Sequence, residues 1–191
     1  MASNFKITFE LDEQDTRYFQ DLYRTAKKNA KAEDAPRIMS EVKALIQRVR
    51  SAKRVPHFVS DAITTLEDLM QMLEDKQYQL PRAVSESAVA GLAYFANAQD
   101  VIPDHIPALG FLDDAIMISI VADEFKHELW AYRKFRSFSE GAEQRPWTSV
   151  AQDRLPKRLE AYRRELRQKV EDRKQRDALR AKATGIRKLT L

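Results

Sequence analysis

Apolar residues recur every three or four positions along most of the chain, which is the pattern of helices with one buried face. Proline and glycine breaks divide this pattern into five helices before the last quarter of the chain. Their expected ranges are about 12–32, 34–52, 56–74, 81–95 and 111–138. In the fifth helix Ile116, Met117, Ile120 and Val121 make the middle apolar on further faces. We therefore expect this helix at the centre of a bundle.

The two ends of the chain depart from this pattern. Residues 5–11 alternate apolar and polar side chains, as a half-buried strand does, and no second strand is evident to pair with them. They are expected to form an extended arm on the helical body or to pair across a homodimer. From residue 153 a narrow apolar stripe runs along an otherwise charged helix, and the stripe fades after Val170. The first half of this helix is expected to dock on the bundle or on a second copy, and the second half to project.

The predicted fold is all-α: a compact bundle of about five helices, a short amino-terminal extended segment and a long basic carboxyl-terminal helix. Ser139-Glu140-Gly141 is expected to end the central helix. The predicted organisation is a helical domain over 1–138, a linker over 139–152 and a basic helical arm over 153–191.

Residues 94–114 interrupt the helical pattern with two prolines, a glycine and four aspartates. Each proline disfavours the helical conformation at the isoleucine before it, so the segment is a shaped connection. Its apolar residues indicate that it packs inward, and its carboxylates then require hydrogen bonds, ion pairs or a ligand. These carboxylates are Asp100, Asp104, Asp113 and Asp114.

Two interpretations of the four aspartates are open. They could hold a hard divalent cation such as Mg²⁺ or Ca²⁺, which prefers oxygen ligands, with Asp104, Asp113 and Asp114 as the ligands. Alternatively, Asp100 and Asp104 accept backbone hydrogen bonds in turns, and Asp113 and Asp114 occupy the first turn of a helix, where free N–H groups favour acids. No other cofactor is implied.

The same segment carries a family resemblance. Tyr94-Phe95, Asp100-Val101-Ile102-Pro103-Asp104 and the run from Ile106-Pro107 to Asp113-Asp114 together resemble the core motif of the YkvA-like family, and the resemblance covers roughly residues 80–130. It implies a small, mostly helical protein. It implies no biochemical activity, and some relatives carry the motif beside membrane-spanning helices.

The charge of the chain is unevenly distributed. Residues 153–191 contain 14 Lys or Arg and 6 Asp or Glu, a local charge of +8, which leaves 19 basic and 23 acidic residues, or −4, elsewhere. This asymmetry favours RNA, DNA or an acidic protein as a partner of the arm. The side chains expected to contact it are Arg158, Arg163, Arg164, Arg167, Arg173, Lys174, Arg176 and Arg180. The interleaved acids allow the alternative of a salt-bridged helix used for packing or dimerisation.

Two further patterns are weaker. Glu124 and His127 form a Glu-x-x-His step, which di-iron bundles use in two copies, but only one copy is present here. A solvated helix end with a surface histidine is the simpler interpretation. The carboxyl terminus is similar to the loading peptides of encapsulin cargo, with Gly185 ending the helix and Ile186 and Leu189 as the apolar side chains that would enter a pocket.

Residue types and motifs that the sequence lacks limit the functions it can have. The absence of cysteine excludes disulfides and thiolate metal sites. The apolar run at 115–122 is far shorter than the roughly 20 residues of a membrane span, and the amino terminus does not resemble a signal peptide, so a cytoplasmic location is expected. No glycine-rich phosphate loop or nucleophile arrangement is recognisable. Enzymatic activity is therefore left open without being favoured.

Three hypotheses follow. The first is a non-enzymatic interaction protein whose basic arm binds nucleic acid, ribonucleoprotein or an acidic protein surface. The second is a metal-binding domain or metal-dependent enzyme that uses the aspartates. The third is a cargo or assembly component addressed by its carboxyl-terminal peptide.

Overall fold

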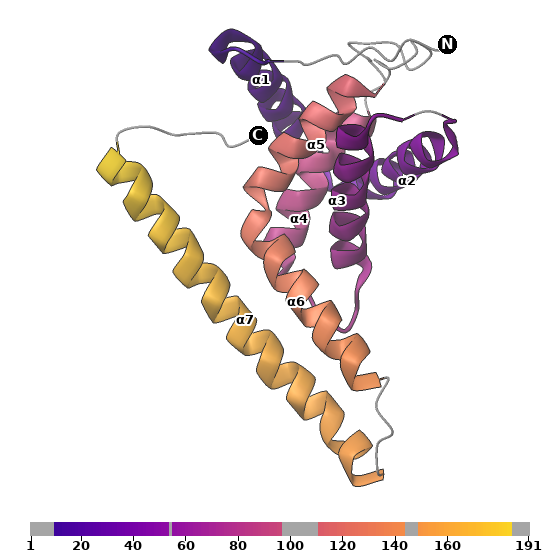
Figure 1. The fold of residues 1–191 in the computed structure, drawn as a ribbon, viewed down its shortest axis with the longest axis vertical. Coiled ribbons are helices and arrows are strands. Elements are labelled where there is room, and N and C mark those ends of the chain that lie inside the picture. The colour runs from indigo at the N-terminus through magenta and orange to yellow at the C-terminus, as the bar shows by residue number, and fades with distance from the viewer. Residues whose placement is uncertain (1–9, 54, 97–110, 144–148, 185–191) are drawn as a thin grey trace, which may run out of the picture.

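The computed structural model describes residues 10–53, 55–96, 111–143 and 149–184, and these residues form an all-α fold (Figure 1). The all-α class predicted from the sequence is confirmed. The α-helices are α1 (Glu13–Asn29), α2 (Ala35–Ser51), α3 (His57–Glu74), α4 (Arg82–Gly91), α5 (Leu112–Glu124), α6 (Lys126–Glu143) and α7 (Ser149–Thr184). Short 3₁₀ helices, η1 (Ala32–Asp34) and η2 (Leu92–Ala96), precede α2 and follow α4. Most of the expected strand at residues 5–11 lies outside the described residues.

The expected single helix over 111–138 was wrong, because two helices, α5 and α6, share this stretch. They meet at Phe125, whose φ of −103° and ψ of 17° depart from helical values. Neither glycine nor proline marks the break, and the apolar spacing continues across it, so periodicity alone could not locate it. The expected helix end at Ser139–Gly141 was also wrong, since α6 continues to Glu143.

Helix α1 starts where the sequence predicts. The side chain of Asp12 accepts hydrogen bonds from the backbone N–H groups of Gln14 and Asp15 at 2.7 and 2.8 Å. The carboxylate of Asp15 in turn accepts from the backbone N–H of Asp12 at 3.2 Å. This reciprocal capping box satisfies donors that the first turn of a helix leaves free.

The core is built on α3 and α5, with α1, α2, α4 and η2 packed around them. Ile63 and Leu66 of α3 and Met117 and Ile118 of α5 are all nearly fully buried. Burial of such side chains is the main favourable contribution to folding, at about 1.5–3 kcal/mol for each. The expectation of a central helix is thus correct for the first part of the predicted 111–138 helix, which is α5.

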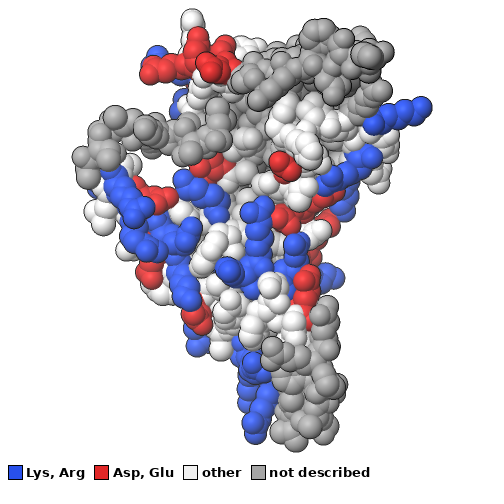
Figure 2. Space-filling view, viewed as in Figure 1, with Lys and Arg blue, Asp and Glu red and all other residues white. Residues whose placement is uncertain are grey.

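Helix α7 runs along α6 (Figure 1). Its apolar stripe provides the contact, with Leu166 and Val170 buried and the rings of Tyr162 and Phe138 centred 4.5 Å apart. The contact does not end where the stripe fades, because Asp177 still bonds to α6. The expected projection of the second half of this helix therefore begins later than predicted. Lys and Arg side chains gather over α7 on the face shown in Figure 2.

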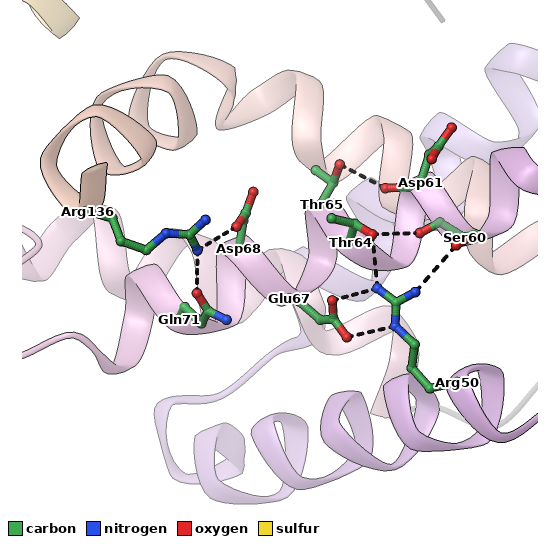
Figure 3. Close-up of polar contacts among 9 residues, drawn as sticks. All are labelled: Arg50, Ser60, Asp61, Thr64, Thr65, Glu67, Asp68, Gln71 and Arg136. Atoms are coloured by element: carbon green, nitrogen blue, oxygen red, sulfur yellow. Dashed lines mark hydrogen bonds and ion pairs between the residues drawn. The ribbon is translucent and has the colours of Figure 1, made fainter. Parts of the chain in front are cut away.

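Polar contacts fix α3 to its neighbours on two sides (Figure 3). From α2, Arg50 donates to both carboxylate oxygens of Glu67, at 2.9 and 2.7 Å. From α6, Arg133 and Arg136 donate to the two oxygens of Asp68 at 2.6 and 2.9 Å. Asp68 is only 8% exposed, so its charge depends on these two cations for compensation.

Gly91 should not tolerate a side chain. A Cβ at this position would lie 2.8 Å from the hydroxyl of Tyr23, which donates to Glu124 at 2.6 Å. We expect Gly91→Ala to displace the tyrosine and to lower the free energy of unfolding by about 1–3 kcal/mol. Gly141 is the matched control, since its Cβ position meets no described atom within 4 Å beyond its chain neighbours and its own helix backbone, and Gly141→Ala should stabilise α6 by about 0.5–1 kcal/mol. Urea unfolding of both variants measures the contrast, and equal effects would contradict it.

Alkaline pH should destabilise the fold. Burial, assisted by nearby carboxylates, raises the pKa of both Tyr78 and Tyr132 from 10.0 to about 12. The unfolded chain therefore loses these protons first, and the free energy of unfolding falls as pH rises from 10 towards 12. Urea titrations across this range measure the slope. Tyr78→Phe should make it shallower, and a flat profile in the wild type would refute the expectation.

Candidate functional site

A pocket of about 210 Å³ lies where the start of α6 meets the carboxyl-terminal part of α7. Residues about fifty positions apart meet here because α7 returns along α6. The pocket is lined by Lys126, His127, Arg173, Arg176, Asp177 and Arg180. Four permanent cations and one carboxylate therefore face one small volume.

His127 is held between an acid and a base. It is 7% exposed, and its Nε2 lies 3.1 Å from Oδ2 of Asp177. The Nε–H of Arg173 donates to Nδ1 of the same ring at 3.3 Å. Both ring nitrogens of His127 therefore have a partner on α7. The expected surface histidine was wrong, because α7 covers the ring.

The negative charge of Asp177, the carboxylate of the pocket, is compensated by neighbouring side chains. Desolvation opposes ionisation of Asp177, but the nearby His127 and Lys126 outweigh it and hold the pKa of this carboxyl below its usual value. Lys126 lies 3.6 Å from Asp177 and 3.1 Å from Asp123. Asp177 therefore stays charged near neutral pH and links the two helices.

Arg173 and Arg176 of the pocket make contacts that do not neutralise their positive charge. The guanidinium of Arg173 stacks 4.4 Å from the centroid of the Trp130 ring, and Arg176 donates its Nε–H to the backbone carbonyl of Asp172 at 3.2 Å. Within the described ranges, no carboxylate lies at ion-pair distance from either guanidinium. Their positive charge is thus open to an external anion.

Other arginines of the predicted arm serve docking. Arg163 and Arg167 donate to the backbone carbonyls of Gln77 and Gln79, at 2.6 and 2.5 Å, in the loop between α3 and α4. These bonds tie the middle of α7 to the body of the protein. Both side chains are therefore engaged within the molecule.

The remaining predicted cations of α7 also have internal neighbours. Arg164 pairs with Glu160 at 3.0 Å, and Lys174 pairs with the buried Glu128 at 2.5 Å. The guanidinium of Arg158 lies 5.7 Å from the centroid of an aromatic ring of α6. These cations support α7 within the molecule, and Arg173, Arg176 and Arg180 line the pocket.

The aspartate segment is only half described. Asp113 and Asp114 lie buried in the first turn of α5, 2% and 8% exposed, where the helix dipole favours acids. Asp100 and Asp104 lie outside the described residues, as do residues 185–191 with the expected terminal peptide. In the part of the chain that the structure covers, no group of three or more His, Asp or Glu side chains is placed to hold a metal ion. The cation interpretation stays a prediction.

The Glu-x-x-His step does not form one site. Glu124 faces α1, where it accepts from the Tyr23 hydroxyl and pairs with Lys27, whereas His127 faces α7. The break at Phe125 lies between them. Burial and the hydrogen bond to Glu124 raise the pKa of Tyr23 far above its usual range, so this tyrosine is a structural donor.

Sequence reasoning missed Lys126, His127 and Asp177 as members of the basic pocket. A usable signal was present, because extending the stripe of α7 from Val170 by three and then four residues gives Arg173 and Asp177. Charged residues at stripe positions indicate a polar contact or a site where an apolar contact is expected. Their partners on α6 could not be identified without the fold.

These features define a small all-α protein with an apolar helical core and a basic pocket between its last two helices. Residues 87–120 match the family described as "Protein of unknown function (DUF1232)". The "Uncharacterized membrane protein YkvA" of Bacillus subtilis (strain 168) is 34% identical over 98 residues, which are 49% of this chain and 85% of that relative. The chain belongs to the YkvA-like family, as its motif indicated. No solved structure matches it.

The relative's description raises the question of membrane association. Among the described residues, none of the helices combines the length and the apolar character that crossing a membrane requires.

Proposed function

We propose that this protein is a non-enzymatic interaction protein that binds RNA or DNA through a basic α6–α7 surface, formed by Lys126, Arg173, Arg176 and Arg180. One observation carries the proposal. Four cations from two helices face one pocket with a single carboxylate. The proposal includes a cytoplasmic location. The absence of cysteine is compatible with that location.

The physics of nucleic acids supports this partner. Their phosphates hold a layer of counterions, and a protein that neutralises phosphates with Arg or Lys releases these ions, which favours binding. Arginine suits the role because its planar guanidinium donates two parallel hydrogen bonds to a phosphate. The local charge of +8 over residues 153–191 would also speed encounter with a polyanion.

The direct test is fluorescence anisotropy of labelled single-stranded RNA and DNA with the full chain at low salt. Deleting the arm is a poor test, because α7 buries side chains of α6 and its removal would disturb the fold. We expect saturable binding of both nucleic acids. No binding at about 50 mM salt, where phosphate contacts are strongest, would contradict the proposal.

The relative's description as a membrane protein favours a second candidate, peripheral binding to an anionic membrane surface. Leu179 is 65% exposed on the same helix as Arg176 and Arg180, so an apolar side chain accompanies the cations. Each Lys or Arg near an anionic bilayer contributes about 1 kcal/mol. Co-sedimentation with phosphatidylserine vesicles, against phosphatidylcholine vesicles, tests this candidate. Binding to the anionic vesicles without binding to RNA or DNA would replace the first candidate with the second.

A further inference from the structure

We infer that the pocket between α6 and α7 is a specific site for a terminal phosphate group, either the phosphate monoester at the end of a nucleic acid or free phosphate or pyrophosphate. The inference rests on the proposed function in naming the nucleic-acid source, and it goes further in assigning the chemical group that the pocket selects. A surface that only neutralises a polyanion would not distinguish the end of a strand from its middle.

The first support is convergence. The cations face a pocket of about 210 Å³ and come from two helices. A water molecule accounts for about 30 Å³ of liquid, so a pocket of this volume has room for a tetrahedral phosphate. A phosphate seated here would be approached by Lys126 from α6 and by Arg176 from α7.

The second support is charge. Lys126, Arg173, Arg176 and Arg180 supply four positive charges, while Asp177 and Asp123, the two acids paired with Lys126, supply two negative ones. The side chains that line the pocket therefore carry more positive than negative charge. A phosphate monoester carries about −1.5 to −2 at neutral pH, whereas each diester of a strand carries only one charge. The monoester is the better match.

The third support is that the guanidinium of Arg173 is already oriented before a ligand binds. Stacking on Trp130 and donation of its Nε–H to His127 hold the plane of the guanidinium before any ligand arrives. These contacts leave the Nη groups to donate to phosphate oxygens. An arginine that is already oriented loses less conformational freedom on binding, so its contacts favour affinity more. His127, itself fixed by Asp177, is a positioning residue in this arrangement.

The test compares two oligonucleotides of identical sequence, one with a 5′-phosphate and one with a 5′-hydroxyl, by anisotropy with the full chain. We expect the phosphorylated strand to bind about tenfold tighter, because a monoester can gain one to three additional charge-assisted hydrogen bonds. Arg173→Lys keeps the charge but removes the planar fork, so it should abolish the preference for the phosphorylated strand. Arg176→Gln, a change at an exposed side chain, should also abolish it. Arg82→Lys on α4, where Arg82 pairs with Glu86, is the control and should retain the preference.

A second experiment uses inorganic pyrophosphate alone and measures the shift in the melting temperature of the protein. Stabilisation by pyrophosphate that Arg173→Lys removes supports the site independently of any nucleic acid. If neither oligonucleotide binds while pyrophosphate still stabilises the wild type, the proposed function fails and the phosphate site stands. If both oligonucleotides bind equally and pyrophosphate does not stabilise the protein, the phosphate site is overturned and the proposed function stands. A preference that survives in both pocket variants would also overturn the inference, because the phosphate would then bind elsewhere.

Discussion

Replacing both Arg133 and Arg136 by Met should lower the free energy of unfolding by about 3–5 kcal/mol, because it leaves the carboxylate of Asp68 buried without a cation. The two arginines bind its two oxygens at 2.6 and 2.9 Å, and the side chain of Asp68 is 11% exposed whereas theirs are 48% and 36% exposed. The acid is thus the group that loses water on folding. Urea unfolding, monitored by circular dichroism, gives the value.

The controls separate the buried charge from lost packing. Adding Asp68→Asn to the double variant removes the charge at nearly constant shape and should recover most of the loss. Arg50→Met disrupts an ion pair with Glu67 whose side chains are 41% and 31% exposed, and should cost only about 1 kcal/mol. A double variant within about 0.5 kcal/mol of the wild type, the usual range for surface substitutions, would show that Asp68 does not need its partners.

Changing Arg173, Arg176 and Arg180 together to Gln should weaken binding to single-stranded RNA about 100-fold at 50 mM salt. The reason is the loss of about three phosphate contacts, each of which contributes counterion release. Anisotropy titrations measure the change. The far-ultraviolet circular dichroism spectrum of the variant should match the wild type, since the apolar contacts of α7 remain.

The matched control removes the same charge elsewhere. Arg17, Arg24 and Arg82 are exposed arginines of α1 and α4, each in a surface ion pair. Their joint replacement by Gln changes the net charge equally and should alter RNA affinity by less than about threefold, since distant charges are screened. Equal weakening by both triple variants would mean that net charge, and not the basic α6–α7 surface, determines binding.

The helical class and much of the core could be predicted from the sequence, because apolar spacing is a local property. Met117, Ile120 and Val121, which make the middle of the predicted central helix apolar, are all buried. The break at Phe125 could not be predicted, since no local breaker marks it and it depends on how α5 and α6 pack.

The candidate site was predictable only in part. An excess of basic residues on the last helix pointed to Arg173, Arg176 and Arg180, but composition could not separate them from Arg163 and Arg167, which bind a distant loop. The difference depends on contacts between residues far apart in the sequence. The burial of His127 has the same origin, because only the return of α7 along α6 covers it.

The salt dependence of RNA affinity in the wild type and in the Arg173, Arg176 and Arg180 triple variant tests the central claim most directly. Each phosphate contact with a single strand contributes about −0.7 to the slope of log K against log salt, so three lost contacts should make the slope shallower by about 2. A reduction of that size would identify these arginines as the groups that neutralise phosphates. Identical slopes for the two proteins would contradict the account, because Arg173, Arg176 and Arg180 would then contact no phosphate.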